Sequence, residues 1–223
     1  MATSIVLFNN FSADMVNFSE LKKNKLGGKF INLQGSSGEK LNIQLPAMRV
    51  PFGLSEFTDK GSGKVTYSLD LSLDDPDVRQ ILQELDERVL QYVVDNSTQF
   101  LGKPYKKEIL QEALFKPMVK LSKGDYAPTL KLKVPTTRDG KFLPSCFEQD
   151  RSVAQIDSIE KGSMVFTIVE LNQIWFIDNK FGVSVRLQQV MKLPRANLTE
   201  FAFTVEKDTD DAASDEIDIP ADV

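Results

Sequence analysis

The sequence predicts a mainly β fold with a few inserted helices, and three stretches predict it. Lys64–Leu73 alternates between apolar and polar residues, which is the pattern of a half-buried strand. Asp74-Asp75-Pro76 opens a stretch with helical spacing, and Ser163–Leu193 holds two long runs of β-branched and aromatic residues around a turn. A chain of 223 residues with 41% hydrophobic residues is long enough for one globular domain with insertions.

The first third of the chain is expected to supply three core strands. Residues 1–28 are interpreted as an N-terminal extension or edge strand. Lys29–Leu33 and Lys40–Leu45 are predicted strands, joined by a turn rich in Gly and Ser. Residues 46–63 contain two prolines and three glycines, so we expect an irregular connection there. In Lys64–Leu73 the apolar side chains face one way and the Thr, Ser and Asp side chains face the other.

Two helices are predicted after the third strand. A carboxylate cap at Asp74 or Asp75 followed by Pro76 is a strong helix start. The helical pattern can continue toward Phe100 and stops at Gly102. Its apolar positions are Val78, Ile81, Leu82, Leu85, Val89, Tyr92 and Val93. A second, shorter helix is expected over Lys106–Lys116, ended by Pro117.

The stretch 116–134 is basic with interleaved aromatics. Thr129–Val134 is a predicted strand in which Lys131 and Lys133 share the face opposite the apolar residues. With Lys120, Lys123 and Tyr126 before them, these lysines could follow a phosphate backbone. A solvated edge strand, on which lysines prevent aggregation, explains the same pattern.

The long hairpin Ser163–Leu193 combines aromatic and cationic residues near its tip. Its turn is expected over Asp178–Gly182, where Asn and Gly tolerate positive φ. An aromatic and basic sheet surface is typical of proteins that hold unpaired nucleic acid. The tryptophan and phenylalanine could equally be ordinary core and turn residues. The residues concerned are Trp175 before the turn, Lys180 and Phe181 in it, and Arg186 after it.

The element order predicts an OB-type Greek-key barrel over residues 29–205. A loop over residues 135–150 connects the strand Thr129–Val134 to the long hairpin. A final strand is expected after the hairpin, over Leu198–Val205. Helical material between the third and fourth core strands matches the barrel's element order. Residues 206–223 contain too few apolar residues to fold and are expected to be a disordered acidic tail.

Charge is divided unevenly along the chain. The net charge is −5, and the eight acidic residues and one lysine of Glu206–Val223 account for −7, which leaves +2 for residues 1–205. Gly102–Ser145 alone holds ten Lys or Arg against four Asp or Glu. A basic body with an acidic tail is therefore expected.

The composition excludes several classes of site. The chain has no histidine and one cysteine, Cys146, which removes the usual zinc sites, most nucleophilic triads and an internal disulfide. Asp70, Asp74 and Asp75 form the only carboxylate cluster beside a strand end, and capping or strand alternation explains them better than metal binding. No cofactor and no enzyme activity are expected. No apolar run reaches the length of a membrane span, and the N-terminus lacks the features of a signal peptide.

Five stretches together resemble a known family: MRVPFGLSEF, KVTYSLDLSLDD, GKPYKKE, YAPTLKLKV and IWFIDNKFGVSVRLQQV. They are similar to single-stranded-DNA-binding proteins of nucleocytoplasmic large DNA viruses, and distantly to phage proteins of this class with acidic tails. The resemblance covers Met48–Leu193 plus the tail. It implies an OB-fold, protection of replication intermediates in an intracellular viral factory or nucleus, and a tail that contacts replication enzymes such as a polymerase or helicase–primase. One departure is that this tail ends in Ala221-Asp222-Val223, whereas the phage tails end in an aromatic residue.

These observations favour sequence-independent binding of single-stranded DNA, with RNA and a homo-oligomer left open. The alternative is a structural or scaffold protein of a virion or replication complex that uses the barrel for protein contacts. We expect stacking by Trp175, Phe181, Tyr126 and Tyr105. We expect phosphate contacts by Lys106, Lys107, Lys120, Lys123, Lys131, Lys133, Lys180 and Arg186. The tail, with Asp210, Asp211, Asp215, Glu216 and Asp218, is expected to compete for the cationic surface and to bind partners, or to serve solubility alone.

Overall fold

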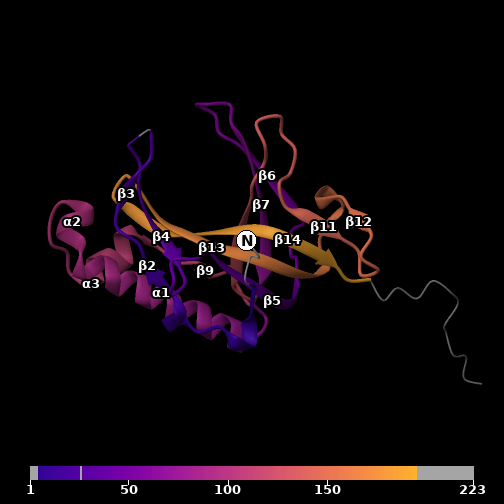
Figure 1. Cartoon of the computed structure of the whole chain (residues 1–223), viewed down its shortest axis with the longest axis horizontal. Coiled ribbons are helices and arrows are strands. Elements are labelled where there is room, and N and C mark those ends of the chain that lie inside the picture. Colours follow the sequence, from indigo (N-terminus) through magenta and orange to yellow (C-terminus); the bar gives the residue numbers. More distant parts are fainter. Residues whose placement is uncertain (1–4, 26, 195–223) are drawn as a thin grey trace, which may run out of the picture.

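The computed structural model describes residues 5–25 and 27–194. A large bent sheet makes up most of this part, and helix α1 lies along one of its faces (Figure 1). The expected strand Leu198–Val205 and the expected tail Glu206–Val223 lie outside the described residues.

The long hairpin lies at the centre of the sheet. Its strands pair with each other, and the first of them also pairs antiparallel with β5 and β4. The main strand order is β1-β5-β13-β14-β10-β7-β6. The strands are β1 Ile5–Leu7, β2 Asn17–Phe18, β3 Lys22–Lys23, β4 Lys29–Gln34, β5 Leu41–Arg49, β6 Leu54–Thr58, β7 Val65–Ser72, β8 Phe115–Lys116, β9 Val119–Lys120, β10 Thr129–Val134, β11 Ser145–Phe147, β12 Val153–Ala154, β13 Met164–Ile177 and β14 Lys180–Lys192.

The helices lie between β7 and β10, as the sequence predicts. Helix α1 spans Pro76–Asp95, and the Asp75 carboxylate caps it by accepting from the amides of Asp77 and Val78. Helix α2 spans Ser97–Leu101 and ends at Gly102, whose φ of 86° is the left-handed conformation of a helix C-terminus. The α1 side chains at helical spacing are buried against the sheet: Val78, Leu82, Leu85, Val89, Leu90 and Val93.

The second predicted helix is shorter than expected. It consists of α3, Lys107–Ile109, followed by a π-helical turn over Leu110–Leu114. The chain then becomes extended, because Phe115–Lys116 pairs with β14 as strand β8. Helical periodicity in the sequence cannot show this pairing, which depends on a strand about 65 residues away in the chain.

The hairpin turn contains two residues rather than five. Asp178 and Asn179 both have positive φ, 50° and 63°, as a tight turn between twisted strands requires. Lys180 and Phe181 therefore belong to β14 and not to the turn. Gly182, predicted as a turn residue, lies inside this strand.

Two predicted loops contain strands. Within 46–63, β5 continues to Arg49 and β6 pairs with β7. Pro46 fits inside β5 because the register with β13 shifts between Val165 and Thr167, and a bulge tolerates a residue that has no amide proton. Within 135–150, β11 pairs with β14.

The described part of residues 1–28 joins the same sheet and core. Strand β1 pairs parallel with β5, and the side chains of Phe8, Phe11 and Val16 are buried.

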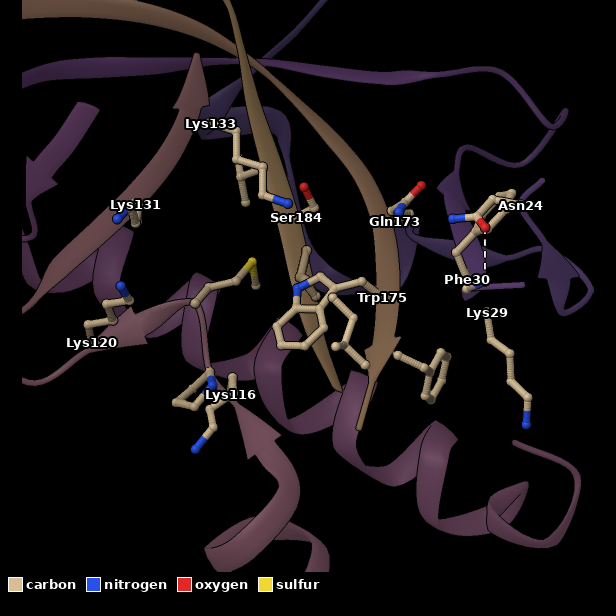
Figure 2. A pocket seen from close by; sticks show the side chains of 17 residues that line it. Asn24, Lys29, Phe30, Lys116, Lys120, Lys131, Lys133, Gln173, Trp175 and Ser184 are labelled. Carbon is tan, nitrogen blue, oxygen red and sulfur yellow. Dashed lines mark hydrogen bonds between the residues drawn. The ribbon is translucent and has the colours of Figure 1, made fainter. Parts of the chain in front are cut away.

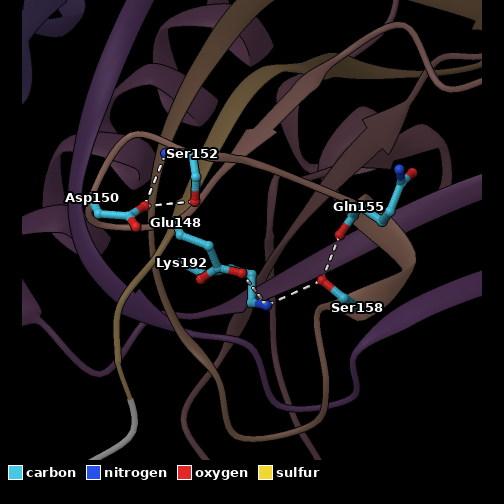
Figure 3. Close-up of polar contacts among 6 residues, drawn as sticks. All are labelled: Glu148, Asp150, Ser152, Gln155, Ser158 and Lys192. Carbon is cyan, nitrogen blue, oxygen red and sulfur yellow. Dashed lines mark hydrogen bonds and ion pairs between the residues drawn. The ribbon is translucent and has the colours of Figure 1, made fainter.

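Polar contacts hold the end of β14. Lys192 Nζ contacts Glu148 Oε1 at 2.8 Å and Ser158 Oγ at 3.1 Å (Figure 3). This contact joins the end of β14 to the loops around β11 and β12.

The two faces of the sheet differ in polarity. On β10, Leu130, Leu132 and Val134 are buried in the core, whereas Lys131 and Lys133 are exposed on the opposite face. In Figure 1 the β3 end of the sheet and the β6–β7 hairpin rise on the side away from α1. The cationic face is therefore the one that α1 leaves uncovered.

Candidate nucleic-acid interface

A hollow of about 450 Å³ lies on the cationic face and contains the chain's only tryptophan. Trp175 is half-buried, and four lysines lie around one side of its ring (Figure 2). We call this hollow the lysine–tryptophan groove and define it by Lys116, Lys120, Lys131, Lys133 and Trp175.

Strand pairing brings these five residues together from four strands. Lys120 of β9 is paired with Thr129 of β10, so that its side chain shares a face with Lys131 and Lys133. Lys116 of β8 is paired with Gly182 of β14, which is in turn paired with Trp175 of β13. Residues far apart in sequence thus meet on one side of the sheet.

Gly182 makes the close approach of β8 and Trp175 to β14 possible. A Cβ atom at this position would lie 2.4 Å from the Lys116 carbonyl oxygen and 3.1 Å from Trp175 Cζ2. Glycine inside a strand often marks such an approach by backbone or ring. Its small size places the indole ring and Lys116 in the same groove.

A second hollow, of about 510 Å³, extends the cationic surface. It shares Lys131 and Lys133 with the groove and adds Lys64, Arg186 and Phe57, a phenylalanine that is 63% exposed. Among the described residues, no carboxylate lines either hollow. Cationic side chains therefore outnumber anionic ones in both linings.

Lys133 lies where the two hollows meet. Its side chain is exposed, but the surrounding protein removes part of the hydration of its ammonium group and so lowers the pKa of that group. The positive charges of Arg186 and Lys64 lower this pKa further. Lys133 and Arg186 are register partners on parallel strands, which keeps their charges close. A bound phosphate would relieve this repulsion.

A buried carboxylate anchors the lysine-bearing segment to α1. Asp86 accepts hydrogen bonds from the Met118 amide at 2.9 Å and the Val119 amide at 3.2 Å, between Lys116 and Lys120. Burial raises the pKa of Asp86 to about 6, although these two hydrogen bonds lower it. Asp86 thus fixes the backbone from which two groove lysines extend.

The predicted site residues separate into several locations. Trp175, Lys120, Lys131 and Lys133 share the groove, and Arg186 lines the hollow next to it. Tyr126 and Lys123 line a different hollow near the ends of β5 and β7. The lining of the groove does not include Tyr105, Lys106 and Lys107, which lie at the start of α3, nor Lys180, which lies at the hairpin tip.

The prediction that Phe181 stacks on bases is wrong. Its side chain is 0% exposed and packs against Phe115 and Phe176, with ring centroids 5.2 and 6.0 Å apart. Because the turn has two residues, Phe181 faces the core while Trp175 faces the groove.

Two other predicted site residues, near α3, have partners within the chain. Lys107 forms an ion pair with Glu87 of α1, and the Lys103 ammonium lies 5.0 Å from the centroid of the Tyr105 ring.

Sequence reasoning missed several cationic and aromatic residues of the two hollows. Lys116 is the last residue of a predicted helix, Phe57 falls in the connection 46–63 that was predicted to be irregular, and Lys64 is the first residue of a predicted strand. Lys29 lines the groove too, but its Nζ donates to the Phe100 carbonyl at 2.9 Å. Gly182 is a sequence signal that could have indicated a close neighbour at this point of the sheet, because a glycine within a β-rich run often marks one.

Two of the three carboxylates near the start of α1 have structural roles. Asp75 caps the helix, and Asp74 pairs with Arg49 at 3.4 Å. Asp70 lies opposite Lys131 in the β7–β10 register. Within residues 5–25 and 27–194, no cluster of three or more acidic or cysteine side chains could hold a metal ion. The helices of this same part are all too short or too polar to cross a membrane.

Comparisons with known proteins give one family match and several weaker similarities. A family model described as a family of unknown function (DUF5871) matches residues 62–204. "Uncharacterized protein L291" of Acanthamoeba polyphaga mimivirus is 25% identical over 187 residues, which is 78% of this chain but only 30% of that relative. The chain thus spans less than a third of the curated relative that it matches.

Two solved phage structures have partly similar folds. The single-stranded-DNA-binding protein gp2.5 of bacteriophage T7 is 17% identical with a TM-score of 0.47, over 75% of this chain and 98% of that one. The single-stranded-DNA-binding protein of bacteriophage Enc34, in complex with single-stranded DNA, is 13% identical with a TM-score of 0.43, over 79% and 94%. At such values the similarities do not decide the function.

Proposed function

This chain belongs to the DUF5871 family, and we propose that it binds single-stranded DNA along the lysine–tryptophan groove. The observation that carries the proposal is one hollow in which a tryptophan and four lysines meet and which no described carboxylate lines. An aromatic ring beside a row of cations is the arrangement that binds a base and its phosphates together.

The chemistry of the groove favours unpaired over paired strands. In a duplex the bases are stacked on each other, so Trp175 can reach a base only in a single strand. Stacking on an aromatic side chain contributes about 1–3 kcal/mol per base and accepts every base. The lysines contact phosphates, which are the same for every sequence, so binding is expected to be largely independent of sequence.

The proposal extends to the fold type and to the acidic tail. The order of β4, β5, β7, the helices, β10 and the β13–β14 hairpin supports an OB-type barrel. We assign residues 206–223 a regulatory part, in which their net charge of −7 competes with DNA for the groove and, once displaced, binds replication proteins. Protection of replication and recombination intermediates would be the resulting activity.

A fluorescence titration tests the proposal, because Trp175 is the only tryptophan. Oligo-dT should quench its emission, and added salt should reverse the quenching, since each lysine–phosphate contact releases counterions. Oligo-rU compares RNA with DNA, and a duplex of equal length should bind more weakly. A scaffold protein would show neither quenching nor any salt-dependent binding by anisotropy, and that result would refute the proposal.

A further inference from the structure

A hollow of about 500 Å³ outside the groove exposes two aromatic rings. It is lined by Phe52 and Tyr126, which are 62% and 82% exposed, together with Arg49, Lys123 and Lys161. We call it the Phe52–Tyr126 hollow. Exposing two rings on one small surface leaves a large apolar area in water, which is typical of a contact site.

The loops that present the two rings are fixed by hydrogen bonds. Ser122 Oγ donates to the Ala127 carbonyl at 2.7 Å and closes the loop that carries Lys123 and Tyr126. The Val50 amide donates to the Ser163 carbonyl at 2.8 Å, and the Gly162 amide donates to the Val50 carbonyl at 2.7 Å. The backbone of the two loops that carry the rings is therefore fixed before any ligand arrives.

Gly53 brings the Phe52 loop against the segment that contains Lys161. Its φ is +73°, and a Cβ atom there would lie 3.2 Å from the Ile159 carbonyl oxygen and 3.3 Å from the Lys161 nitrogen. A larger residue would be strained in this conformation and would push the two segments apart. The hollow thus depends on a close backbone approach, as the groove does at Gly182.

Positive charge accompanies the rings. The Arg49 guanidinium donates to Ser72 Oγ at 3.0 Å and lies 3.4 Å from Asp74, which orients it at the rim of the hollow. Lys123 extends from the same loop as Tyr126. No carboxylate among the described residues lines the hollow, so its chemistry matches that of the groove.

The hollow and the groove lie on the same face of the sheet. Thr129 lines the hollow and pairs with both Ser72 and Lys120, a groove residue. Lys131 follows two residues later on the same face, about 7 Å along the strand. A flexible polyanion bound in the groove can therefore continue along β10 into the hollow.

We infer that the Phe52–Tyr126 hollow is a second base-binding site, occupied by nucleotides of the same single strand that the groove binds. Tyr126 and Phe52 stack on one or more bases, and Lys123 and Arg49 contact the adjacent phosphates. The inference depends on the proposed function and adds the direction in which the strand leaves the groove.

The test compares oligo-dT lengths from about 4 to about 16 nucleotides, the range of site sizes known for single OB folds. Affinity of the wild-type protein should rise with length until both sites are filled. The double substitution Phe52→Leu and Tyr126→Leu keeps apolar side chains but removes both rings. It should leave the shortest oligomer unaffected and weaken the longest by about 5- to 100-fold, as loss of stacking on one base predicts.

The control is Leu121→Ala, which truncates an 84% exposed side chain in the loop that carries Tyr126. It should change the affinity for neither the shortest nor the longest oligo-dT. Equal affinity of the double variant and the wild type at every length would overturn the second site while leaving the groove intact. A uniform loss at every length, or a loss caused by Leu121→Ala as well, would also overturn it. Absence of binding by the wild-type protein at any length would instead refute the proposed function, and the second site with it.

Discussion

Replacing Asp86 by asparagine is expected to remove most of the pH dependence of stability between about pH 5 and pH 7. Asp86 is 6% exposed, and burial raises its pKa from 3.8 to about 6. The folded protein therefore takes up this proton at a higher pH than the unfolded chain. The stability that protonation of Asp86 contributes is fully present below pH 3.8 and is lost as pH rises through about 6.

The magnitude follows from the two pKa values. A difference between 3.8 and about 6 corresponds to a total of about 3 kcal/mol in the free energy of unfolding. About half of it, ~1.5 kcal/mol, should be gained when the pH falls from about 7 to about 5. The chain has no histidine, so no ordinary imidazole titration overlaps this window.

Urea unfolding at three pH values, followed by circular dichroism, measures this dependence. The Asp86→Asn variant turns one acceptor into a donor that faces the Met118 and Val119 amides, so it should lose about 1–3 kcal/mol from that contact. The readout is therefore the change in stability with pH and not the stability itself. The variant should show little change between about pH 7 and pH 5.

Glu87→Gln serves as the matched control, because Glu87 is the next residue on α1, is exposed and pairs with Lys107. Its profile should follow that of the wild type. If the Asp86→Asn variant gained as much stability on acidification as the wild type, the buried carboxylate would not be the titrating group and the reasoning would fail.

Three further predictions concern the groove and the tail. Lys131→Met and Lys133→Met should each reduce the slope of log affinity for oligo-dT against log salt concentration by about 0.7, the contribution of one phosphate contact in a single strand. Lys106→Met should leave this slope unchanged, and equal slopes in all three variants would contradict the assignment of the DNA to the groove. Gly182→Ala should weaken oligo-dT binding and destabilise the fold by about 1–3 kcal/mol in thermal unfolding, because its methyl group would meet Lys116 and Trp175; a neutral result would refute the close approach. Deleting Glu206–Val223 should tighten binding, most at low salt, and unchanged or weaker binding would disprove competition by the tail.

Local patterns in the sequence located most of the regular elements. The alternation in Lys64–Leu73 and Thr129–Val134 predicted β7 and β10 almost to the residue. Capping chemistry placed the start of α1 at Pro76, since a carboxylate and a proline suit the first turn in any context. These features depend on residues close together in the chain.

Other elements depended on partners that the chain reaches only after folding. Strand β6 forms because β7 offers it an edge, and β8 is extended because β14 pairs with it. The predicted helix over Lys106–Lys116 and the predicted irregular connection over 46–63 were wrong at these points. Pairing with a distant strand overrode the local preference in both.

The candidate site was only partly visible in the sequence. The shared face of Lys131 and Lys133 follows from strand alternation, and the structure adds Lys116 and Lys120 beside Trp175 through two strand pairings. The orientation of the Phe181 ring depends on the length of the hairpin turn. A turn two residues long instead of five decides whether its ring faces the core or solvent, and propensity alone does not distinguish the two lengths.

The sequence by itself therefore determined the mainly β character of this protein, the helix start at Pro76, the absence of histidine chemistry and the uneven distribution of charge. Only the tertiary structure decided which rings are buried and which cations share a hollow. The physical reason is that alternation, capping and charge are properties of neighbouring residues. A groove, in contrast, is formed by strands such as β8, β10 and β13, whose proximity depends on the packing of the whole sheet.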